Sequence, residues 1–345
     1  MPPKRTPPYK KPTIQDVARL AGVSHSTVSR VLNYDSATIP ISEETRQRIM
    51  EAVQELGYQP NMTARSLKTQ RTQMIAVMIG DISNAFYHPI VRQIQDVAGT
   101  HNYDVLISNS DHIYEQEKRF LDTILRRPVD GIIMAPHCLK TEDIDLFMKR
   151  SHIPIVALGA QVSHPLVDVV GGTSEPATYE AVKWLIEVKG HQRIGFISTF
   201  DNMPPGPSRL HGYQRAMEEH GLEVKPEFVQ YAEFTIEGGQ RAMHAFLNQP
   251  KPPTVVFAAN SLMAIGAMMV ARQQGYRVPD DIGIMGFDDI PEALIVTPQL
   301  TTVIRDLPRI GRQLVDILFA RMLGEVKGPG RFFQSEWKLM IRESV

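Results

Sequence analysis

Apolar residues between Thr13 and Asn33 follow the spacing of two short amphipathic helices. The first helix is expected to begin after Thr13, whose side chain can cap it, and to end at Gly22, which tolerates the left-handed backbone of a sharp reversal. Its apolar residues share one face at the i, i+3, i+4 and i+7 positions, namely Ile14, Val17, Ala18 and Ala21. In the second helix, which Ser24 caps, the apolar residues are Val28, Val31 and Leu32. The pattern predicts a helix-turn-helix motif.

A third amphipathic helix is predicted between an N-cap at Ser42 and a stop at Gly57. The acidic residues Glu43 and Glu44 in its first turn favour a helix N-terminus. Its apolar residues are Ile49, Ala52, Val53 and Leu56. Because three short helices can close one small core, we expect an all-α headpiece over residues 12–58. A tail rich in Pro, Lys and Arg precedes it, and we expect residues 1–11 to be disordered.

Residues 59–72 are expected to link this headpiece to the rest of the chain as a hinge helix. Pro60 stops the third helix, and Asn61 can cap the short segment MTARSLK. An isolated helix shorter than about 12 residues is marginal, because nucleation is costly. We therefore expect this helix to form only on DNA.

From Gln73 onward, the pattern changes to short, continuously apolar runs with helical stretches between most of them. The runs are MIAVMI, YDVLIS, DGIIMA, IPIVAL, RIGFIS, TVVFAA and DIGIMGF. Such runs are typical of parallel strands covered by helices on both faces. They are too many for one sheet, so two doubly wound α/β lobes are predicted, with a ligand in the cleft between them. We place the first lobe at about 73–171 and 301–330, and the second at about 172–300 and 331–345.

Seven segments carry a resemblance that covers essentially the whole chain. They are DVARLAGVSHSTVSRVLN, ISEETRQRI, LGYQPNMTARSLKTQRT, DISNAFYHPIV, RIGFIS, FAANSLMAIGAM and GFDD. In order and approximate spacing they resemble the landmarks of the lactose-repressor (LacI/GalR) family of bacterial transcription regulators. The resemblance implies a periplasmic-binding-protein-like core, a homodimer on a pseudo-palindromic DNA operator, and a small-molecule effector in the cleft. A repressor is expected. The nearest alternatives are an activator and a regulator that needs a co-repressor.

The second helix carries the residues expected to read DNA bases. Arg30 can bind a guanine through O6 and N7. His25 and Ser26 match positions that set operator choice in the family, so the resemblance implies base contacts for them as well. Contacts to phosphate, which position the protein without specifying sequence, are expected from Thr13, Thr27, Asn33 and Ser42. The segment YDSATIPI is longer than the usual connection after Asn33.

The hinge segment is expected to contact the minor groove. The resemblance implies that two hinge helices pair in the dimer and insert Leu67 into the central base step, which kinks the DNA. Ala64 is small enough for close approach, and Arg65 or Lys68 can meet the backbone or the groove. Without the resemblance, the same residues describe a flexible linker.

Five residues match the effector pocket of the family, each just after a strand: Phe86, Tyr87, Arg209, Asn260 and Asp288. The aromatic rings can stack on a ligand, and Arg209 can fork onto hydroxyls or a carboxylate. Gly159 and Ser261 stand where many members carry an acidic residue. These departures weaken a pentose or hexose effector, although the resemblance implies that sugars are the commonest class, and sugar acids, sugar phosphates and nucleobase-like molecules are open as well.

Composition and charge agree with this interpretation. The net charge is −1, but residues 1–72 carry 11 Lys and Arg against 6 Asp and Glu (+5), and the remainder carries 26 against 32 (−6). A basic headpiece on an acidic core fits attraction of the headpiece to phosphate. No apolar signal segment, membrane-spanning run, catalytic motif, metal-ligand spacing or cofactor motif is apparent. A cytoplasmic regulator is therefore favoured over a solute-binding protein or an enzyme.

Overall fold

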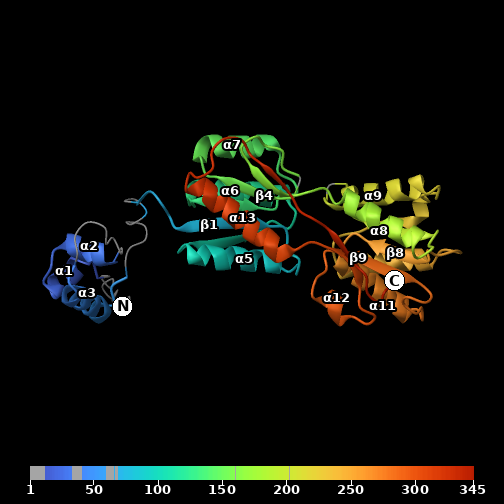
Figure 1. The fold of residues 1–345 in the computed structure, drawn as a ribbon, viewed down its shortest axis with the longest axis horizontal. Coiled ribbons are helices and arrows are strands. Elements are labelled where there is room, and N and C mark those ends of the chain that lie inside the picture. Colours follow the sequence, from blue (N-terminus) through green and yellow to red (C-terminus); the bar gives the residue numbers. More distant parts are fainter. Residues whose placement is uncertain (1–11, 33–40, 60–65, 67–68, 160, 202) are drawn as a thin grey trace, which may run out of the picture. The chain divides into compact units, whose positions relative to one another are not determined.

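The computed structural model describes residues 12–32, 41–59, 66, 69–159, 161–201 and 203–345 (Figure 1). The chain divides into two compact units, Met1–Thr72 and Gln73–Val345, each with its own hydrophobic core. The predicted tail at 1–11, the longer connection after Asn33 and most of the predicted hinge helix lie outside the described residues.

Among the described residues of the first unit, three helices form one core, as the sequence predicts: α1 (Ile14–Ala21), α2 (His25–Leu32) and α3 (Glu43–Leu56). Thr13 and Asp16 make a capping box at the start of α1, in which each side chain accepts a hydrogen bond from the other's backbone amide. Gly22 ends α1 in the left-handed conformation. Each helix contributes a fully buried residue to one core: Val17, Val28 and Ile49.

The first lobe of the second unit is built on a six-stranded sheet in the order β11-β5-β4-β3-β1-β2. Its strands are β1 (Met74–Ile79), β2 (Asp104–Asn109), β3 (Gly131–Met134), β4 (Ile155–Leu158), β5 (Asp168–Gly171) and β11 (Phe332–Gln334). All neighbouring strands are parallel. Residues of β1 alternate between two helical layers. Ile75 and Val77 pack toward α5 (Tyr87–Thr100) and α13 (Leu307–Met322), whereas Ala76 and Met78 pack toward α6 (Tyr114–Arg126) and α7 (Thr141–Ser151).

The second lobe repeats this plan in the order β12-β10-β9-β8-β6-β7. Its strands are β6 (Ile194–Ser198), β7 (Val229–Tyr231), β8 (Val255–Ala258), β9 (Gly283–Phe287), β10 (Thr301–Ile304) and β12 (Lys338–Met340). On one face lie α8 (Glu175–Glu187) and α9 (Gly206–Glu219), and on the other α10 (Ile236–Leu247) and α11 (Ser261–Gln273). The short elements η1 (Pro226–Phe228) and α12 (Glu292–Ile295) complete it. The predicted pair of doubly wound sheets is confirmed, with β12 antiparallel to β10.

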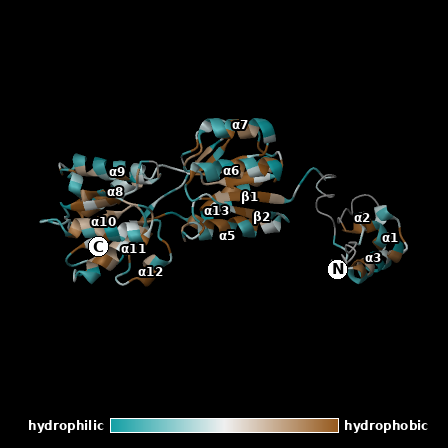
Figure 2. Ribbon diagram, turned by 180° about the vertical axis from the view of Figure 1, so that it is seen from behind, coloured by the Kyte–Doolittle hydropathy of each residue, from teal (hydrophilic) through white to brown (hydrophobic). Residues whose placement is uncertain are grey.

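Figure 2 shows hydrophobic strands inside each lobe and hydrophilic residues along outer helices such as α9. This arrangement follows from burying each sheet on both faces, which leaves the polar side of each helix to water. Among the described helices, none is both long and apolar enough to cross a lipid bilayer.

The chain crosses between the lobes in three places, and two of these differ from the sequence prediction. The predicted return to the first lobe at 301 is wrong, because β10 pairs with β9 in the second sheet, and only α13 after it packs on the first lobe. The predicted passage back at 331 is also wrong, because β11 pairs with β5 in the first sheet. The connections are therefore 172–174, 305–306 and 335–337. Strands of three or four residues carry too little periodicity for the sequence to assign them to a sheet.

Candidate functional site

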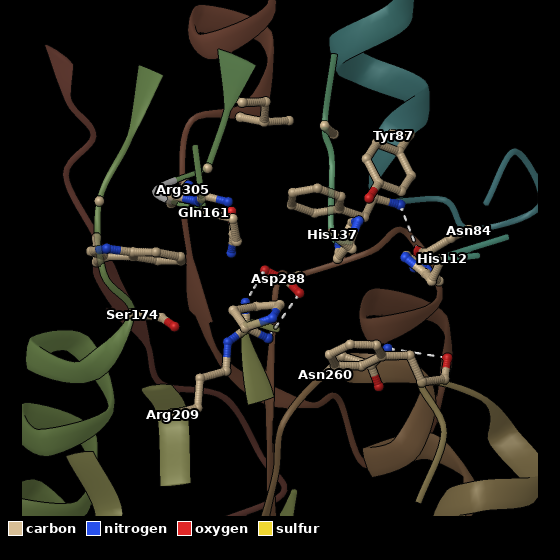
Figure 3. A pocket seen from close by; sticks show the side chains of 18 residues that line it. Asn84, Tyr87, His112, His137, Gln161, Ser174, Arg209, Asn260, Asp288 and Arg305 are labelled. Atoms are coloured by element: carbon tan, nitrogen blue, oxygen red, sulfur yellow. Dashed lines mark hydrogen bonds and ion pairs between the residues drawn. The ribbon is translucent and has the colours of Figure 1, made fainter. Parts of the chain in front are cut away.

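A single pocket collects all five residues that the sequence singled out for a ligand (Figure 3). Phe86 and Tyr87 come from the start of α5 in the first lobe, whereas Arg209, Asn260 and Asp288 come from the second lobe. The pocket has an empty volume of about 690 Å³, including the part open to solvent. That size is in the usual range for small-molecule sites.

In the second-lobe floor of the pocket, which we define as Arg209, Asn260 and Asp288, most polar groups have partners within the second lobe. Arg209 is 2% exposed, and its Nη1 and Nη2 donate to Asp288 Oδ2 and Oδ1, both at 3.1 Å. Its guanidinium lies 3.6 Å from the Phe287 ring centroid, and Nη1 also donates to the Ala259 carbonyl. The fork that we expected Arg209 to place on a ligand is therefore on Asp288. Burial lowers the pKa of Arg209, and the Asp288 carboxylate opposes that change.

Asn260 serves as the N-cap of α11. Its Oδ1 accepts from the Met263 amide at 2.8 Å, and its Nδ2 donates to the Phe234 carbonyl at 3.3 Å. Both polar groups of this side chain thus have partners within the second lobe. Asn260 therefore holds the turn between β8 and α11.

Phe86 and Tyr87 differ in how much they offer to a ligand. Their rings meet edge to face, with centroids 5.0 Å apart. Tyr87 is 5% exposed and packs into the core of the first lobe, where burial raises its pKa. Phe86 is only partly buried and packs against the cores of both lobes. Phe86 is consequently the better placed of the two for stacking.

Three pocket residues that the sequence analysis missed lie on the connections between the lobes. Ser174, Arg305 and Trp337 each belong to a different connection, and we call them the connection wall. The Arg305 guanidinium lies 4.2 Å from the Trp337 ring centroid and 5.7 Å from that of Phe86. Its Nη1 donates to Ser335 Oγ at 3.3 Å. Burial lowers the pKa of Arg305 to about 10, so the group is charged at neutral pH.

Two further missed residues, His112 and His137, face each other with ring centroids 4.1 Å apart. Burial lowers the pKa of both imidazoles, that of His137 to about 3, so His137 is neutral at pH 7. Glu117 holds the loop that carries His137. Its carboxylate is fully buried and accepts from the backbone amides of His137, Cys138 and Leu139 at 2.7–2.9 Å.

Unpartnered polar atoms concentrate in this pocket. Among the described residues, eight buried side-chain nitrogen or oxygen atoms have no hydrogen-bond partner, and six of the eight belong to residues that line it. The six are His112 Nδ1, His137 Nδ1, Ser174 Oγ, Arg209 Nε, Arg305 Nε and Trp337 Nε1. Because buried polar atoms are nearly always paired in folded proteins, this concentration indicates a place where bound water or a ligand supplies the partners.

The structure gives a physical reason for the residues at positions 159 and 261, where the resemblance led us to expect acidic side chains. Gly159 has a φ of 96°, a backbone conformation that residues with a side chain rarely adopt. Ser261 is buried and donates to the Phe287 carbonyl at 2.7 Å. Among the described residues that line the pocket, Asp288 is the only one with a carboxylate.

In the headpiece, α2 presents the predicted base-reading residues on its polar side. His25 and Ser26 are exposed, and Arg30 is partly buried, with its Nε donating to the Ser26 carbonyl at 3.4 Å. Ser26 and Thr27 exchange hydrogen bonds with the Ser24 hydroxyl, both at 2.8 Å.

The hydroxyls of Thr13 and Ser42 cap α1 and α3. The remaining predicted DNA contacts lie outside the described residues: Asn33, Ala64, Arg65, Leu67 and Lys68.

The helix-turn-helix headpiece and the two-lobed pocket together define the class of ligand-responsive DNA-binding proteins. The family model "Bacterial regulatory proteins, lacI family" matches residues 13–61, and that of the periplasmic binding protein-like domain matches residues 185–345. The chain belongs to the LacI family of bacterial transcription regulators.

Similar proteins cover nearly the whole chain. The transcriptional repressor CytR of Escherichia coli strain K12 is 36% identical, over 96% of each chain. A transcriptional regulator CelR in complex with cellobiose is 30% identical, with a TM-score of 0.71 over 97% of this chain and 100% of the other. A lac repressor dimer bound to operator and the anti-inducer ONPF is 26% identical, with a TM-score of 0.82 over 97% and 99%. These proteins are regulators, and this chain is likewise a regulator rather than an enzyme.

Proposed function

We propose that this chain is a cytoplasmic repressor that binds a pseudo-palindromic operator as a homodimer and responds to a small molecule in the pocket between its lobes. In this proposal residues 12–58 bind DNA, 59–72 form the hinge helix, and 73–345 bind the effector and dimerise. The lac repressor structure, a dimer on its operator, supports the assembly. The single observation that carries the effector role is the concentration of unpartnered buried polar atoms in one pocket.

The position of the pocket explains how a bound ligand changes the affinity of the protein for DNA. Its lining includes both lobes and at least one residue from each connection between them. A ligand that binds these residues favours one angle between the lobes, and a ligand acts only through its different affinity for the two arrangements. The angle decides whether two hinge helices meet, with Leu67 in the minor groove and Ala64, Arg65 and Lys68 beside it.

The effector role is tested by measuring operator binding with and without ligands. An operator is first selected from random DNA with the purified full chain, and its affinity is then measured by fluorescence anisotropy with sugars, sugar acids, sugar phosphates and nucleobases. At least one compound should change operator affinity by about 5–150-fold, the usual range of allosteric coupling. Trp337→Ala should reduce that change while leaving operator affinity without ligand intact. A full response in this variant would remove the pocket from the proposal.

Base reading by α2 is tested with Arg30→Ala. Loss of a bidentate guanine contact should weaken operator binding by about 1–3 kcal/mol and relax preference at one base pair. Arg19→Ala is the matched control, because Arg19 is an exposed arginine on α1 that pairs with Asp16. Equal weakening of Arg30→Ala on the operator and on unrelated DNA would show a phosphate contact instead.

A further inference from the structure

The charges that line the pocket do not balance. Asp288 forms an ion pair with Arg209, with one hydrogen bond to each carboxylate oxygen, and it also acts electrostatically on Arg305. Arg305 is the second guanidinium of the pocket, and among the described residues it forms no ion pair with a carboxylate. Asp81 acts on the neighbouring His112, but it does not line the pocket, and its Oδ1 accepts from the Ser83 amide and hydroxyl. With His137 neutral, the pocket holds one positive charge in excess.

The unpartnered atoms show the same imbalance in hydrogen bonding. Three of them can only donate: Arg209 Nε, Arg305 Nε and Trp337 Nε1. The other three, on Ser174 and the two histidines, can donate or accept.

Several side-chain oxygens of the pocket already accept hydrogen bonds, which leaves mainly Ser174 Oγ and the exposed Gln161 amide oxygen to accept from a ligand. Asn84 Oδ1 accepts from the Phe86 amide at 3.0 Å, and Asn260 Oδ1 and Asp288 accept the bonds described above. Every hydroxyl of a neutral sugar brings a donor that needs such an acceptor. The pocket is therefore complementary to a ligand rich in acceptors.

We propose that the effector is a small organic anion whose carboxylate or phosphate lies against Arg305 and Trp337 in the connection wall. This inference rests on the proposed function and specifies its ligand class. Charge-assisted hydrogen bonds from Arg305 Nε and Trp337 Nε1 satisfy both donors and neutralise the guanidinium. Phe86 and Phe234 also line the pocket, and their rings can pack against the apolar or ring portion of such a molecule.

The chain carries its own reporter for this site. It has two tryptophans, and Trp184 lies in α8, away from the pocket lining. In the full-length Trp184→Phe protein, fluorescence comes from Trp337 alone. Iodide, an anion, and caesium, a cation, are used as quenchers at equal ionic strength. The quenching constant of each is divided by its value for free N-acetyltryptophanamide. Iodide should quench Trp337 at least twofold more efficiently than caesium.

Variants at Arg305 decide whether this preference comes from its charge. Arg305→Gln should bring the iodide to caesium ratio close to one, whereas Arg305→Lys should retain the preference. Arg312→Gln is the matched control, because Arg312 is an exposed arginine on α13 that pairs with Asp316. A ratio near one in the parent protein, or a ratio that Arg305→Gln leaves unchanged, overturns the proposal.

Matched ligand pairs then separate the possible anions. The pairs are ribose and ribose 5-phosphate, glucose and glucuronate, and uracil and orotate, titrated against Trp337 fluorescence. The charged member of at least one pair should bind at least tenfold more tightly, and Arg305→Gln should remove that advantage. Tighter binding of the phosphate or of a carboxylate identifies the group. Preference for the neutral member in all pairs overturns the charge inference.

The failure of this inference is distinguishable from failure of the proposed function. A neutral sugar that binds at Trp337 and changes operator affinity leaves the effector pocket in place and overturns only the anionic ligand. A compound that changes operator affinity without any effect on Trp337 fluorescence contradicts the pocket itself.

Discussion

The second-lobe floor and the connection wall lie in the same pocket but differ in how their polar groups are satisfied. Arg209 in the floor is 2% exposed and forms a bidentate ion pair with Asp288, although its Nε has no partner, and Asn260 caps a helix. Arg305 in the wall has one hydrogen bond, to Ser335, and an Nε without a partner. Ser174 and Trp337 also carry unpartnered atoms.

The difference separates two roles, building the pocket and binding the ligand, which the family resemblance alone does not distinguish. The floor is held by contacts within the second lobe, so its residues build the pocket before any ligand arrives. The wall lies on the connections, and its free donors need a ligand. We therefore expect changes in the floor to affect stability most, and changes in the wall to affect ligand binding most.

Removing each arginine gives the largest contrast. Arg209→Ala should lower the free energy of unfolding by about 3–5 kcal/mol, because it leaves the Asp288 charge without its partner. Arg305→Ala should lower it by about 1 kcal/mol or less, because only one hydrogen bond and ring contacts are lost. Urea denaturation followed by circular dichroism measures both. In the double variant Arg209→Met/Asp288→Leu most of the loss should be recovered, and equal losses for the two single variants would contradict the contrast.

A pH series examines the buried histidine of the pocket. The folded pKa of His137 is about 3, against an ordinary value of 6.5. Between those values the unfolded chain binds a proton that the folded chain does not, so stability falls as the pH drops below about 6.5. From pH 7 to pH 5 this contributes a loss of about 2 kcal/mol. The loss should be absent in His137→Gln, and the same decline in both proteins would show that His137 is not the responsible group.

The smallest effects on binding and stability are expected from removing single hydrogen bonds, one in the connection wall and one in the second-lobe floor. Ser335→Ala removes the acceptor for Arg305 and should weaken binding of a pocket ligand by up to about tenfold, with little change in stability. Asn260→Ala removes an N-cap and should lower stability by about 1 kcal/mol. Calorimetric titration and thermal melts of both variants test this pair. A reversed pattern, with affinity lost in Asn260→Ala and stability lost in Ser335→Ala, would exchange the roles of floor and wall.

The sequence predicted the headpiece and the two sheets because their signals are local. Thr13 and Gly22 bracket one helix, and continuous apolar runs such as MIAVMI need burial on both faces. Its errors concern β10 and β11, strands of four and three residues whose sheet depends on long-range pairing.

The same limit applies to the pocket. All five predicted residues line it, and they follow strands or begin helices in recognisable segments. Arg305 immediately follows a strand, so its position could have been noticed, but Trp337 is brought beside it only by the third crossing. That Arg209 binds Asp288 instead of remaining free for a ligand depends on residues 79 positions apart. No local pattern carries that information.

The central claim is that occupancy of this pocket controls operator binding. Trp184→Phe protein is mixed with a fluorescently labelled operator, and Trp337 emission and operator anisotropy are recorded in the same titration with a ligand. We predict that both signals change with one midpoint at each DNA concentration, and that this midpoint shifts with DNA concentration as reciprocal coupling requires. Saturation of the Trp337 signal with no change in operator affinity, for every ligand that binds, would contradict the claim.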